Sequence, residues 1–555
     1  MQIIIPMSGF GERFRKAGYK VPKPLIELEG KPIIAHVIEM FPFESDFIFI
    51  CNQDHLDNQE YQIEATIKNF CPSGKIVSIP AHKLGPVHAV MIAIDHINLE
   101  RPVVVNYCDF TCYWDWLDFK DMVKETDCDG AIPAYKGFHP HSLGSTNYAY
   151  LKEKDGWAHD IQEKEPYTNN RMEEYASSGT YYFKTGSLMY KEMQYMVKEK
   201  LTVGGEYYVS LAYKRLMTEY GRVAVYPLQH FMQWGTPQDV SEYRYWSRAF
   251  SSYQIKTTLN RTTSGLGTVV LPSAGLGSRF SREGWSTPKP LIEVAGTPMI
   301  IKAATDLPLA SNYVFVVRDD MKGMNQVIKT LGDVFPSCII KKITSVTEGQ
   351  ACTVKLGLAE LISSNKFDGG PVTVGACDNG ALYDTEKLTS LMKSSDYDVI
   401  VWGVRGYPNA SRHPEMYGWI DSDGDQIKGI SVKTPLSNPD DDPLVLGAFT
   451  FKKVSDLDRS IDSLIKRGGK INGEYYMDSV INDAIELGLK CVLFEVDSYL
   501  CWGTPNDLKT YEYWQSCFHK WSGHNYQLDF DDRVDPSKLG LLKDKYKNIK
   551  PSWPI

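Results

Sequence analysis

The stretch IPMSGFGERFRKAGYKVPKPLIELEGKPII occupies residues 5–34, and residues 271–300 repeat its pattern as LPSAGLGSRFSREGWSTPKPLIEVAGTPMI. In both places an apolar run typical of a buried strand leads into a Gly-x-Gly turn, and Pro-Lys-Pro-Leu follows after a spacer. Two occurrences of so specific a pattern in one chain indicate an internal repeat, which has to be traced before any other feature is interpreted.

The repeat extends far beyond these two stretches, in the same order and with an offset of about 266 residues throughout. Three further matching pairs are VVVNYCDF (103–110) with VTVGACDN (372–379), GEYYVSLAYKRL (205–216) with GEYYMDSVINDA (473–484), and QWGTPQDVSEYRYW (233–246) with CWGTPNDLKTYEYW (501–514). Stacking repeats have periods of roughly 20–50 residues, so this much longer period indicates a duplicated domain.

Each copy alternates apolar strand-like runs with helical stretches such as HAVMIAIDHI and CTVKLGLAELI. This alternation predicts an α/β fold, with a central mixed, mostly parallel sheet flanked by helices. The polar, Ser- and Thr-rich segment between the copies suits a linker. We expect four parts along the chain: domain one at 1–250, a linker at 251–266, domain two at 267–520 and a C-terminal tail at 521–555.

Composition excludes several classes of protein. The chain has 555 residues, a net charge of -9 and a sequence pI near 5.8, which disfavours non-specific binding to nucleic acid or to an anionic membrane. Eleven scattered cysteines do not form a disulfide framework, and no stretch approaches the roughly 18–20 apolar residues of a membrane span. The N-terminal MQIIIPMSGFG suggests a strand, not a signal peptide, so we expect a cytoplasmic protein.

The Gly-x-Gly turn at Gly9 and Gly11 is suited to binding an anion, because glycine lets backbone N–H groups approach a ligand closely. Arg13 follows at once, and Lys23 stands between two prolines that stiffen its loop. A guanidinium fork and an ammonium group beside such a turn suit a polyphosphate, whereas the alternative is a solvated surface turn. The whole set recurs in the second copy as Gly275, Gly277, Arg279 and Lys289.

Gly-x-Gly-x-Arg, a spacer, Pro-Lys-Pro-Leu and then Gly-x-Pro together resemble the signature of the nucleotidylyltransferases that activate sugar 1-phosphates. The resemblance runs through both copies and implies two tandem Rossmann-like nucleotidyltransferase domains. It also implies the reaction NTP + sugar phosphate → NDP-sugar + pyrophosphate with Mg²⁺, as in the biosynthesis of surface polysaccharides. The attacking group is then a phosphate anion, so positioning and charge neutralisation suffice and no general base is needed.

The resemblance assigns roles residue by residue. The implied catalytic residues, which meet the phosphates, are Arg13, Lys23, Arg279 and Lys289. The implied nucleotide-binding residues are Gly9, Gly11, Gly85, Gly275, Gly277, Gly349 and Gln350. The implied acceptor-binding residues are Lys164, Gly179, Glu206, Lys433, Gly447 and Glu474, although a helix-capping role is open for the two glutamates. The implied magnesium ligands are Asp109 and Asp378, for which a capping role is the alternative.

The two copies also depart from the family pattern and from each other. Gln233 and Cys501 stand where the family often carries a second metal-binding Asp, so a second metal ligand is left undecided. Asp497 is a candidate substitute in copy two, where copy one has Gln229. Gln350 can hydrogen-bond a pyrimidine through its side chain, whereas its counterpart Pro86 cannot. His139 and His141 are either metal ligands or part of a polar loop that shapes the acceptor pocket.

Several alternatives stay open at this point. The acceptor is a sugar 1-phosphate or a phosphorylated non-sugar resembling phosphocholine or a phosphoamino acid, which would make the protein a cytidylyltransferase. One copy is catalytic or is a regulatory nucleotide sensor for the other. A metal-dependent glycosyltransferase would need an Asp-x-Asp signature, which CDF (108–110) and CDN (377–379) lack. The base, the acceptor and the oligomeric state are left undecided.

Overall fold

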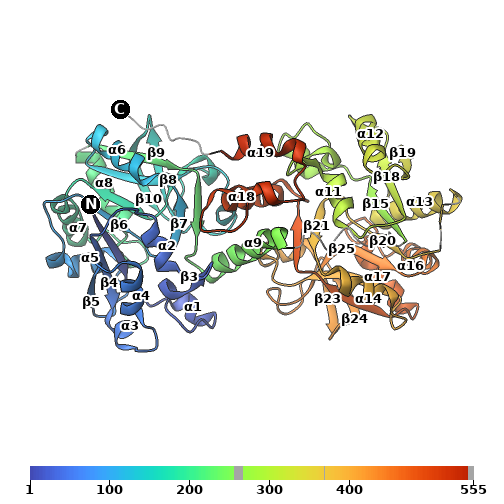
Figure 1. Cartoon of the computed structure of the whole chain (residues 1–555), viewed down its shortest axis with the longest axis horizontal. Coiled ribbons are helices and arrows are strands. Elements are labelled where there is room, and N and C mark those ends of the chain that lie inside the picture. The colour runs from blue at the N-terminus through green and yellow to red at the C-terminus, as the bar shows by residue number, and fades with distance from the viewer. Residues whose placement is uncertain (220, 256–266, 365, 368, 548–555) are drawn as a thin grey trace. The chain divides into compact units, whose positions relative to one another are not determined.

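The computed structural model describes residues 1–219, 221–255, 267–364, 366–367 and 369–547 (Figure 1). The chain separates into two compact units, which are treated one by one. Unit 1 consists mainly of Met1–Arg244 and also includes Lys520–His524, whereas unit 2 consists of Tyr245–His519 and Asn525–Tyr546.

Unit 1 is built on a ten-stranded mixed sheet. Its strands, in sheet order, are β11 (Tyr175–Ser177), β9 (Ala149–Lys154), β10 (Trp157–Glu163), β13 (Val223–Leu228), β8 (Gly130–Tyr135), β12 (Thr180–Phe183), β6 (Val103–Asn106), β1 (Gln2–Met7), β4 (Phe47–Asn52) and β5 (Lys75–Ile79). The half β6-β1-β4-β5 is parallel, as expected, and its strands are fully or largely apolar because helices cover both faces.

The other half of this sheet is largely antiparallel. The sheet is therefore mixed, as predicted, but it has fewer parallel strand pairs than the sequence suggested. Strands β9 and β10 form a hairpin, and β12 runs antiparallel to both of its neighbours. The turn between β9 and β10 places Asp155 at φ 55° and Gly156 at φ 82°. Two consecutive residues with positive φ make the tight hairpin turn that matches the twist of its strands, and Asp-Gly is a favoured sequence for it.

Unit 2 repeats the same strand order. Its sheet runs β19 (Ile339–Ile343), β18 (Asn312–Arg318), β15 (Thr268–Ser273), β20 (Val372–Val374), β25 (Leu444–Phe451), β22 (Val399–Val404), β26 (Cys491–Glu495), β24 (Gln426–Val432) and β23 (Gly418–Asp423). Each strand from β19 to β23 corresponds to one strand of unit 1 read from β5 to β9, with the same parallel and antiparallel pairings. The expected fold, two tandem Rossmann-like α/β domains, is therefore confirmed.

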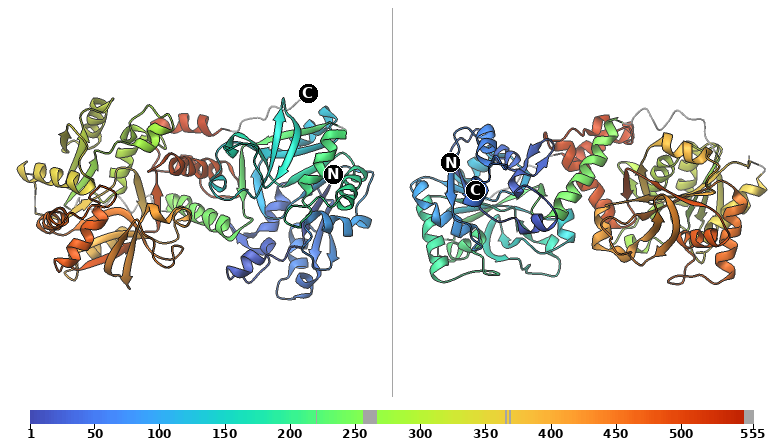
Figure 2. Two further views of the ribbon diagram at one scale, coloured as in Figure 1. Left: turned by 180° about the vertical axis from the view of Figure 1, so that it is seen from behind. Right: turned by 90° about the horizontal axis from the view of Figure 1, so that it is seen from below.

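Each unit also contains helices, several of which pack on the faces of its sheet (Figures 1 and 2). In unit 1 they are α1 (Glu12–Lys16), α2 (Ile33–Glu39), α3 (Gln53–Asp57), α4 (Ile63–Phe70), α5 (Pro86–Ile92), α6 (Trp116–Thr126), α7 (Gly186–Lys198) and α8 (Val209–Glu219). In unit 2 they are α10 (Ser278–Arg282), α11 (Met299–Asp306), α12 (Met324–Val334), α13 (Gln350–Ser363), α14 (Thr385–Lys393), α15 (Pro408–Arg412), α16 (Val454–Lys466), α17 (Met477–Glu486), α18 (Pro505–Lys520) and α19 (Leu539–Tyr546).

Short elements carry much of the loop structure. The two-stranded ribbons are β2 (Glu27–Leu28) with β3 (Lys31–Pro32), β7 (Phe110–Tyr113) with β14 (His230–Gln233), β16 (Glu293–Val294) with β17 (Thr297–Pro298), and β21 (Asn379–Leu382) with β27 (Ser498–Cys501). The single-turn 3₁₀ helices η1 (Lys23–Leu25) and η5 (Lys289–Leu291) hold the two Pro-Lys-Pro-Leu sequences. Nowhere in the described part of the chain is a helix both long and apolar enough to cross a membrane.

The predicted boundary at residue 250, between domain one and the linker, falls inside a helix. Helix α9 (Pro237–Ile255) continues past residue 250 into the segment expected to be a linker, and residues 256–266 lie outside the described residues. Most of the predicted tail belongs to unit 2, where Tyr526 and Tyr546 are only 1% and 4% exposed. The tail is thus a packed part of unit 2, because its aromatic side chains bury apolar area there.

Candidate active site

The glycine turns of the two units have the same shape. Gly11 precedes α1 with φ 62°, and Gly277 precedes α10 with the same φ. This left-handed conformation is strained for residues that carry a Cβ, so glycine is favoured there. A Cβ added at Gly9 or Gly275 would meet no atom within 4 Å, so the first glycine of each turn borders open space where a ligand fits.

The predicted catalytic lysine and the predicted metal-binding aspartate meet in both units. Lys23 Nζ donates to Asp109 Oδ2 at 2.8 Å, and Lys289 Nζ donates to Asp378 Oδ2 and to the Gly503 carbonyl. Burial disfavours the charged lysine, but the adjacent carboxylate outweighs this effect, so the pKa of Lys23 and of Lys289 is raised above its usual value. Both lysines are therefore held as cations, although their side chains remain about one-fifth exposed, at 24% and 19%.

The Trp-Gly-Thr-Pro sequences explain how each aspartate is placed. Strand β14 pairs with β7 so that Gln233 lies opposite Phe110, and Trp234 N–H donates to the Asp109 carbonyl at 2.9 Å. A Cβ on Gly235 would lie 2.4 Å from Gln233 Nε2 and 3.1 Å from Asp109 Oδ2, so a larger residue there would displace the Gln233 amide. In unit 2, Trp502 N–H donates to the Asp378 carbonyl in the same way, with Cys501 in place of the glutamine.

The structure overturns the interpretation of Asp497 as a candidate second metal ligand. In the β21/β27 ribbon Cys501 lies opposite Asn379, beside Asp378, whereas Asp497 N–H donates to the carbonyl of Leu382. Leu382 is four residues further along the strand from Asp378, which corresponds to about 13 Å. Asp497 therefore lies at the opposite end of the ribbon, and sequence proximity to the motif was misleading.

The metal-ligand interpretation of His139 and His141 finds no support in the geometry. Both side chains are buried in an aromatic cluster with Tyr135 and Phe231, and His141 Nε2 lies 2.9 Å from Tyr135 Oη. Burial lowers the pKa of His139 to about 4, so it is neutral. In the residues that the structure describes, no cluster of three or more His, Cys, Asp or Glu side chains is arranged to hold a metal ion.

The loop expected to read the base is fixed by backbone hydrogen bonds to the Gly-Glu-Tyr-Tyr loop. In unit 1, Tyr207 N–H donates to Leu84 O and Val87 N–H donates to Tyr207 O, at 2.9 and 3.1 Å. In unit 2, Tyr475 makes the equivalent pair of bonds, to Glu348 and from Ala351, at 2.8 and 3.0 Å. Gly85 and Gly349, with φ 87° and 129°, make this close approach of two backbones sterically feasible. Gln350 and Pro86, which follow these glycines, are both half-buried.

His82 is a unit 1 residue that sequence reasoning missed. Leu84 N–H donates to His82 Nδ1 at 3.2 Å, which places the ring proton on Nε2, 3.3 Å from Ser8 Oγ. This side chain connects the end of β1 to the base loop. The corresponding positions of unit 2 are Ala274 and Val346, so the connection exists in unit 1 alone, and no motif signalled it.

The predicted acceptor-binding residues of unit 1 are joined by a tyrosine that the prediction did not include. Lys164, held at φ 62°, donates from Nζ to Tyr208 Oη at 2.5 Å, and Tyr208 Oη donates to Glu206. Arg13 is exposed, and its charge acts on both Lys23 and Tyr208. Arg13 therefore interacts electrostatically with Lys23 and with the tyrosine that joins the predicted acceptor-binding residues.

Glu163, next to Lys164, is a second missed residue. Its Oε2 accepts a hydrogen bond from Ser210 Oγ at 2.5 Å. Burial raises the pKa of Glu163 to about 7, against the opposing influence of Ser210 and Lys164. The Glu-Lys dipeptide was a usable signal, because a carboxylate on an inward-facing strand position next to a functional lysine is costly to bury without a purpose.

The raised pKa of Glu163 predicts a pH-dependent stability. A carboxyl whose folded pKa exceeds its unfolded value near 4.5 stabilises the fold below pH 4.5, and this stabilisation is lost as the pH rises through about 7. Glu163→Gln removes the titration, so the variant gains melting temperature relative to wild type as the pH rises from 5 to 8. Thermal unfolding across that range measures it, with the exposed Glu165→Gln as the matched control. An identical pH profile for wild type and Glu163→Gln would contradict the prediction.

Unit 2 builds its acceptor end from the same backbone and different side chains. Lys433, at φ 61°, donates from Nζ to the Met416 carbonyl and lies 5.7 Å from the ring centre of Tyr476. Burial lowers the pKa of Lys433, an effect that Asp478 opposes and Arg279 reinforces. Glu474 contacts Tyr476. Arg279 and Glu474 therefore act electrostatically on Lys433.

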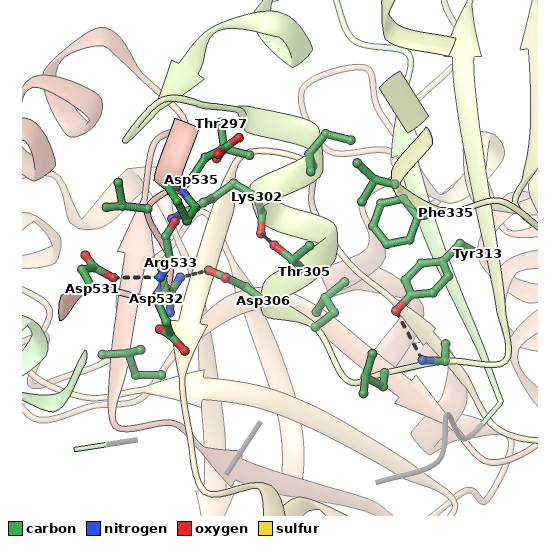
Figure 3. A pocket seen from close by; sticks show the side chains of 18 of the residues that line it. Thr297, Lys302, Thr305, Asp306, Tyr313, Phe335, Asp531, Asp532, Arg533 and Asp535 are labelled. Atoms are coloured by element: carbon green, nitrogen blue, oxygen red, sulfur yellow. Dashed lines mark hydrogen bonds and ion pairs between the residues drawn. The ribbon is translucent and has the colours of Figure 1, made fainter. Parts of the chain in front are cut away.

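A cavity of unit 2 is a different feature. It has a volume of about 1120 Å³ and lies against α11 and residues 528–539 (Figure 3). Its walls include Tyr313, Phe335 and an ion pair between Arg533 and Asp306, and Lys302 donates to the Arg533 carbonyl. Burial lowers the pKa of Lys302 to about 8. None of the predicted site residues lines this cavity.

Comparisons with known proteins match the first unit to one family model. Residues 2–221 match the family model described as Nucleotidyl transferase. A curated relative from Ralstonia pickettii, named bifunctional protein GlmU, is 34% identical over 110 residues, which is 20% of this chain and 22% of that protein. Mannose-1-phosphate guanyltransferase of Schizosaccharomyces pombe is 27% identical over 153 residues, 26% of this chain and 40% of that protein. The chain thus spans about a fifth to two-fifths of the length of these relatives.

Solved structures also match. The nucleoside-diphosphate-sugar pyrophosphorylase from Vibrio cholerae RC9 is 20% identical, with a TM-score of 0.38. The match covers 44% of this chain and 98% of the pyrophosphorylase chain. The inositol-1-phosphate CTP transferase from T. maritima is 14% identical, with a TM-score of 0.36. The match covers 47% of this chain and 99% of the transferase chain.

Proposed function

We propose, from the premise that residues 2–221 belong to the nucleotidyl transferase family, that each unit transfers a nucleotidyl group from an NTP to a phosphorylated acceptor and releases pyrophosphate. The observation that carries the proposal is the Lys-Asp pair, which occurs in both units as Lys23–Asp109 and Lys289–Asp378. Unit 2 lies outside the matched family segment, so its assignment depends on these shared residues and on the shared strand order.

The chemistry needs charge and alignment. An oxygen of the acceptor phosphate attacks the α-phosphorus of the NTP, a new P–O bond forms, and the bond to pyrophosphate breaks with its electron pair leaving on pyrophosphate. No proton is removed from the nucleophile, which is already an anion. The cationic Lys23 and the exposed Arg13 neutralise the phosphates, and Lys164 binds the phosphate of the acceptor. Lys289, Arg279 and Lys433 perform the same tasks in unit 2.

The favoured acceptor is a sugar 1-phosphate, which would place the enzyme in NDP-sugar formation for surface polysaccharides in the cytoplasm. The relative from Schizosaccharomyces pombe is named as a mannose-1-phosphate guanyltransferase, which supports this class of acceptor. A phosphorylated non-sugar with a cytidine nucleotide is the second candidate. The partly buried ring of Tyr107 beside Gly179 favours it, because aromatic faces bind quaternary ammonium groups.

Unit 1 has residues that fit a magnesium ion. The Asp109 carboxylate and the Gln233 amide flank Gly235, and both offer the oxygen ligands that Mg²⁺ prefers, with substrate phosphates completing its shell. When bound there, the ion would neutralise phosphate charge. In unit 2 the Cys501 thiol replaces the amide, and burial raises its pKa further, so Asp378 is the hard ligand that remains.

Measurement of pyrophosphate tests the proposed function. The full chain is incubated with Mg²⁺, each of five NTPs (ATP, GTP, CTP, UTP and dTTP) and a panel of sugar 1-phosphates, phosphocholine and polyol phosphates, with a no-acceptor control. We expect acceptor-dependent pyrophosphate and a nucleotide-linked product of matching mass. The proposal is wrong if no combination releases pyrophosphate, or if release is the same without an acceptor.

A further inference from the structure

The two units differ most where the acceptor would lie. In unit 1 a Cβ on Gly179 would meet the Tyr107 ring at 2.9 Å and the Phe110 ring at 3.2 Å. The corresponding glycine of unit 2, Gly447, has Ala376 and Asn379 as its neighbours, each at 3.5 Å. Two aromatic rings are therefore replaced by a methyl group and an amide, whose Nδ2 donates to the Leu446 carbonyl.

A half-buried carboxylate also occupies different positions in the two units. In unit 1 the strand residue Glu163 carries it, and the first turn of α8 holds the small Ser210. In unit 2 the equivalent strand residue is Val432, and the first turn of α17 holds Asp478 instead. The acid has thus moved from one wall of the site to the facing wall, and each unit keeps a single acid at these two positions.

A third difference makes room for the relocated acid. The unit 2 counterpart of Ala149 is Gly418, and a Cβ there would lie 2.2 Å from Asp478 Oδ2. Without this glycine the Asp478 side chain would not fit in its position. Asp478 is half-buried, and its charge acts on Lys433, the lysine proposed to bind the phosphate of the acceptor.

From these three linked differences we infer that the units use two different phosphorylated acceptors, and that Asp478 is the residue that selects the acceptor of unit 2. This inference rests on the proposed function. The acceptor of unit 2 presents a hydroxyl or ammonium donor towards α17 and a polar edge towards Asn379. The acceptor of unit 1 presents its donor towards β10, where Glu163 lies, and a less polar face towards Tyr107 and Phe110.

A purely structural role for Asp478 is the competing explanation, because an acid in the first turn of a helix stabilises that helix. The two explanations differ in what they change. A helix-stabilising acid affects folding and, through it, both substrates alike, whereas a selecting residue affects the KM of the acceptor and leaves the KM of the NTP unchanged. Glu486→Gln, at the exposed C-terminal end of the same helix, is a control for the loss of one carboxylate charge.

Each unit is assayed alone by inactivating the other: Lys23→Met leaves unit 2, and Lys289→Met leaves unit 1. The kcat/KM of each is measured over sugar 1-phosphates, polyol phosphates, phosphoethanolamine and phosphocholine. We expect the preferred acceptors to differ, with relative preferences at least tenfold apart. The same ranking in both units, within threefold, overturns the inference and leaves the proposed function standing. If neither protein releases pyrophosphate, the proposed function and the inference fall together.

The role of Asp478 is then tested in the Lys23→Met protein. Asp478→Asn is expected to raise the KM of the acceptor at least tenfold while the KM of the NTP stays within twofold. The triple change Gly418→Ala, Val432→Glu and Asp478→Ser, which moves the acid to the unit 1 position, shifts the preference towards the acceptor of unit 1. Equal losses for both substrates, or an unchanged acceptor KM, would refute the assignment, and a reading of melting temperature identifies variants that fail to fold.

Discussion

Lys23→Met lowers the turnover of unit 1 by about 10²–10³-fold, the usual effect of removing one preorganised charge from a site where negative charge develops. The ammonium group is held as a cation by Asp109 at 2.8 Å, so its removal takes away a fixed positive charge and leaves the carboxylate unbalanced. The measurement is pyrophosphate release by Lys23→Met in a Lys289→Met background, against Lys289→Met alone. Because both units carry the pair, the single variants retain activity and the double variant loses it.

Lys31→Met is the matched control for that experiment. Lys31 lies in the same N-terminal segment, is 41% exposed in its side chain and pairs with Glu39 alone in the described contacts. Its loss is expected to change turnover by less than twofold, since exposed ion pairs contribute little. Full activity of the double lysine variant would remove these lysines from the mechanism.

Gly349→Ala is expected to destabilise unit 2 by about 2–4 kcal/mol, a large effect for one methyl group. The new Cβ would lie 2.4 Å from Tyr475 N and 2.6 Å from Tyr475 O, which are backbone atoms and cannot rotate away. Relief of the clash breaks the two hydrogen bonds that hold the base loop to the Gly-Glu-Tyr-Tyr loop. The positive φ of 129° adds backbone strain.

Denaturant unfolding and hydrogen exchange at residues 348–352 and 473–477 measure this effect. The matched control is Gly275→Ala in the same unit, where a Cβ meets no atom within 4 Å and φ is not in the left-handed region. We expect Gly275→Ala to keep its stability and to change only nucleotide binding. Equal stability of the two variants would show that the base loop is not fixed as the structure indicates.

Much of the site followed from short motifs, because the residues of the glycine turn and the Pro-Lys-Pro-Leu loop lie close together in sequence and shape their own backbone. Asp109 and Asp378 were also predictable, since each directly follows an apolar strand, and ligands of α/β folds lie at the carboxyl ends of strands. Asp497 shows the limit of this reasoning. It is close to Cys501 in sequence, but a strand carries it away from the site.

The side-chain pairs that distinguish the two predicted acceptor sites could not be predicted from sequence motifs. Ser210 contacts Glu163 across 47 positions of sequence, and Asp478 acts on Lys433 across a similar separation. Neither pair forms a motif, because each partner is an ordinary residue of its own strand or helix. Their significance appears only when the equivalent walls of the two sites are compared.

The sequence by itself determined the duplication, the α/β class and the glycine, arginine and lysine groups for phosphate, because these depend on local backbone geometry and on a pattern that recurs along the chain. The tertiary structure alone decided which carboxylate faces each lysine, what fills the space beside Gly179 and Gly447, and that the base loop is clamped by Tyr207 and Tyr475. Those features depend on packing between elements far apart in sequence, where the burial of a charge or the room for one methyl group sets the outcome.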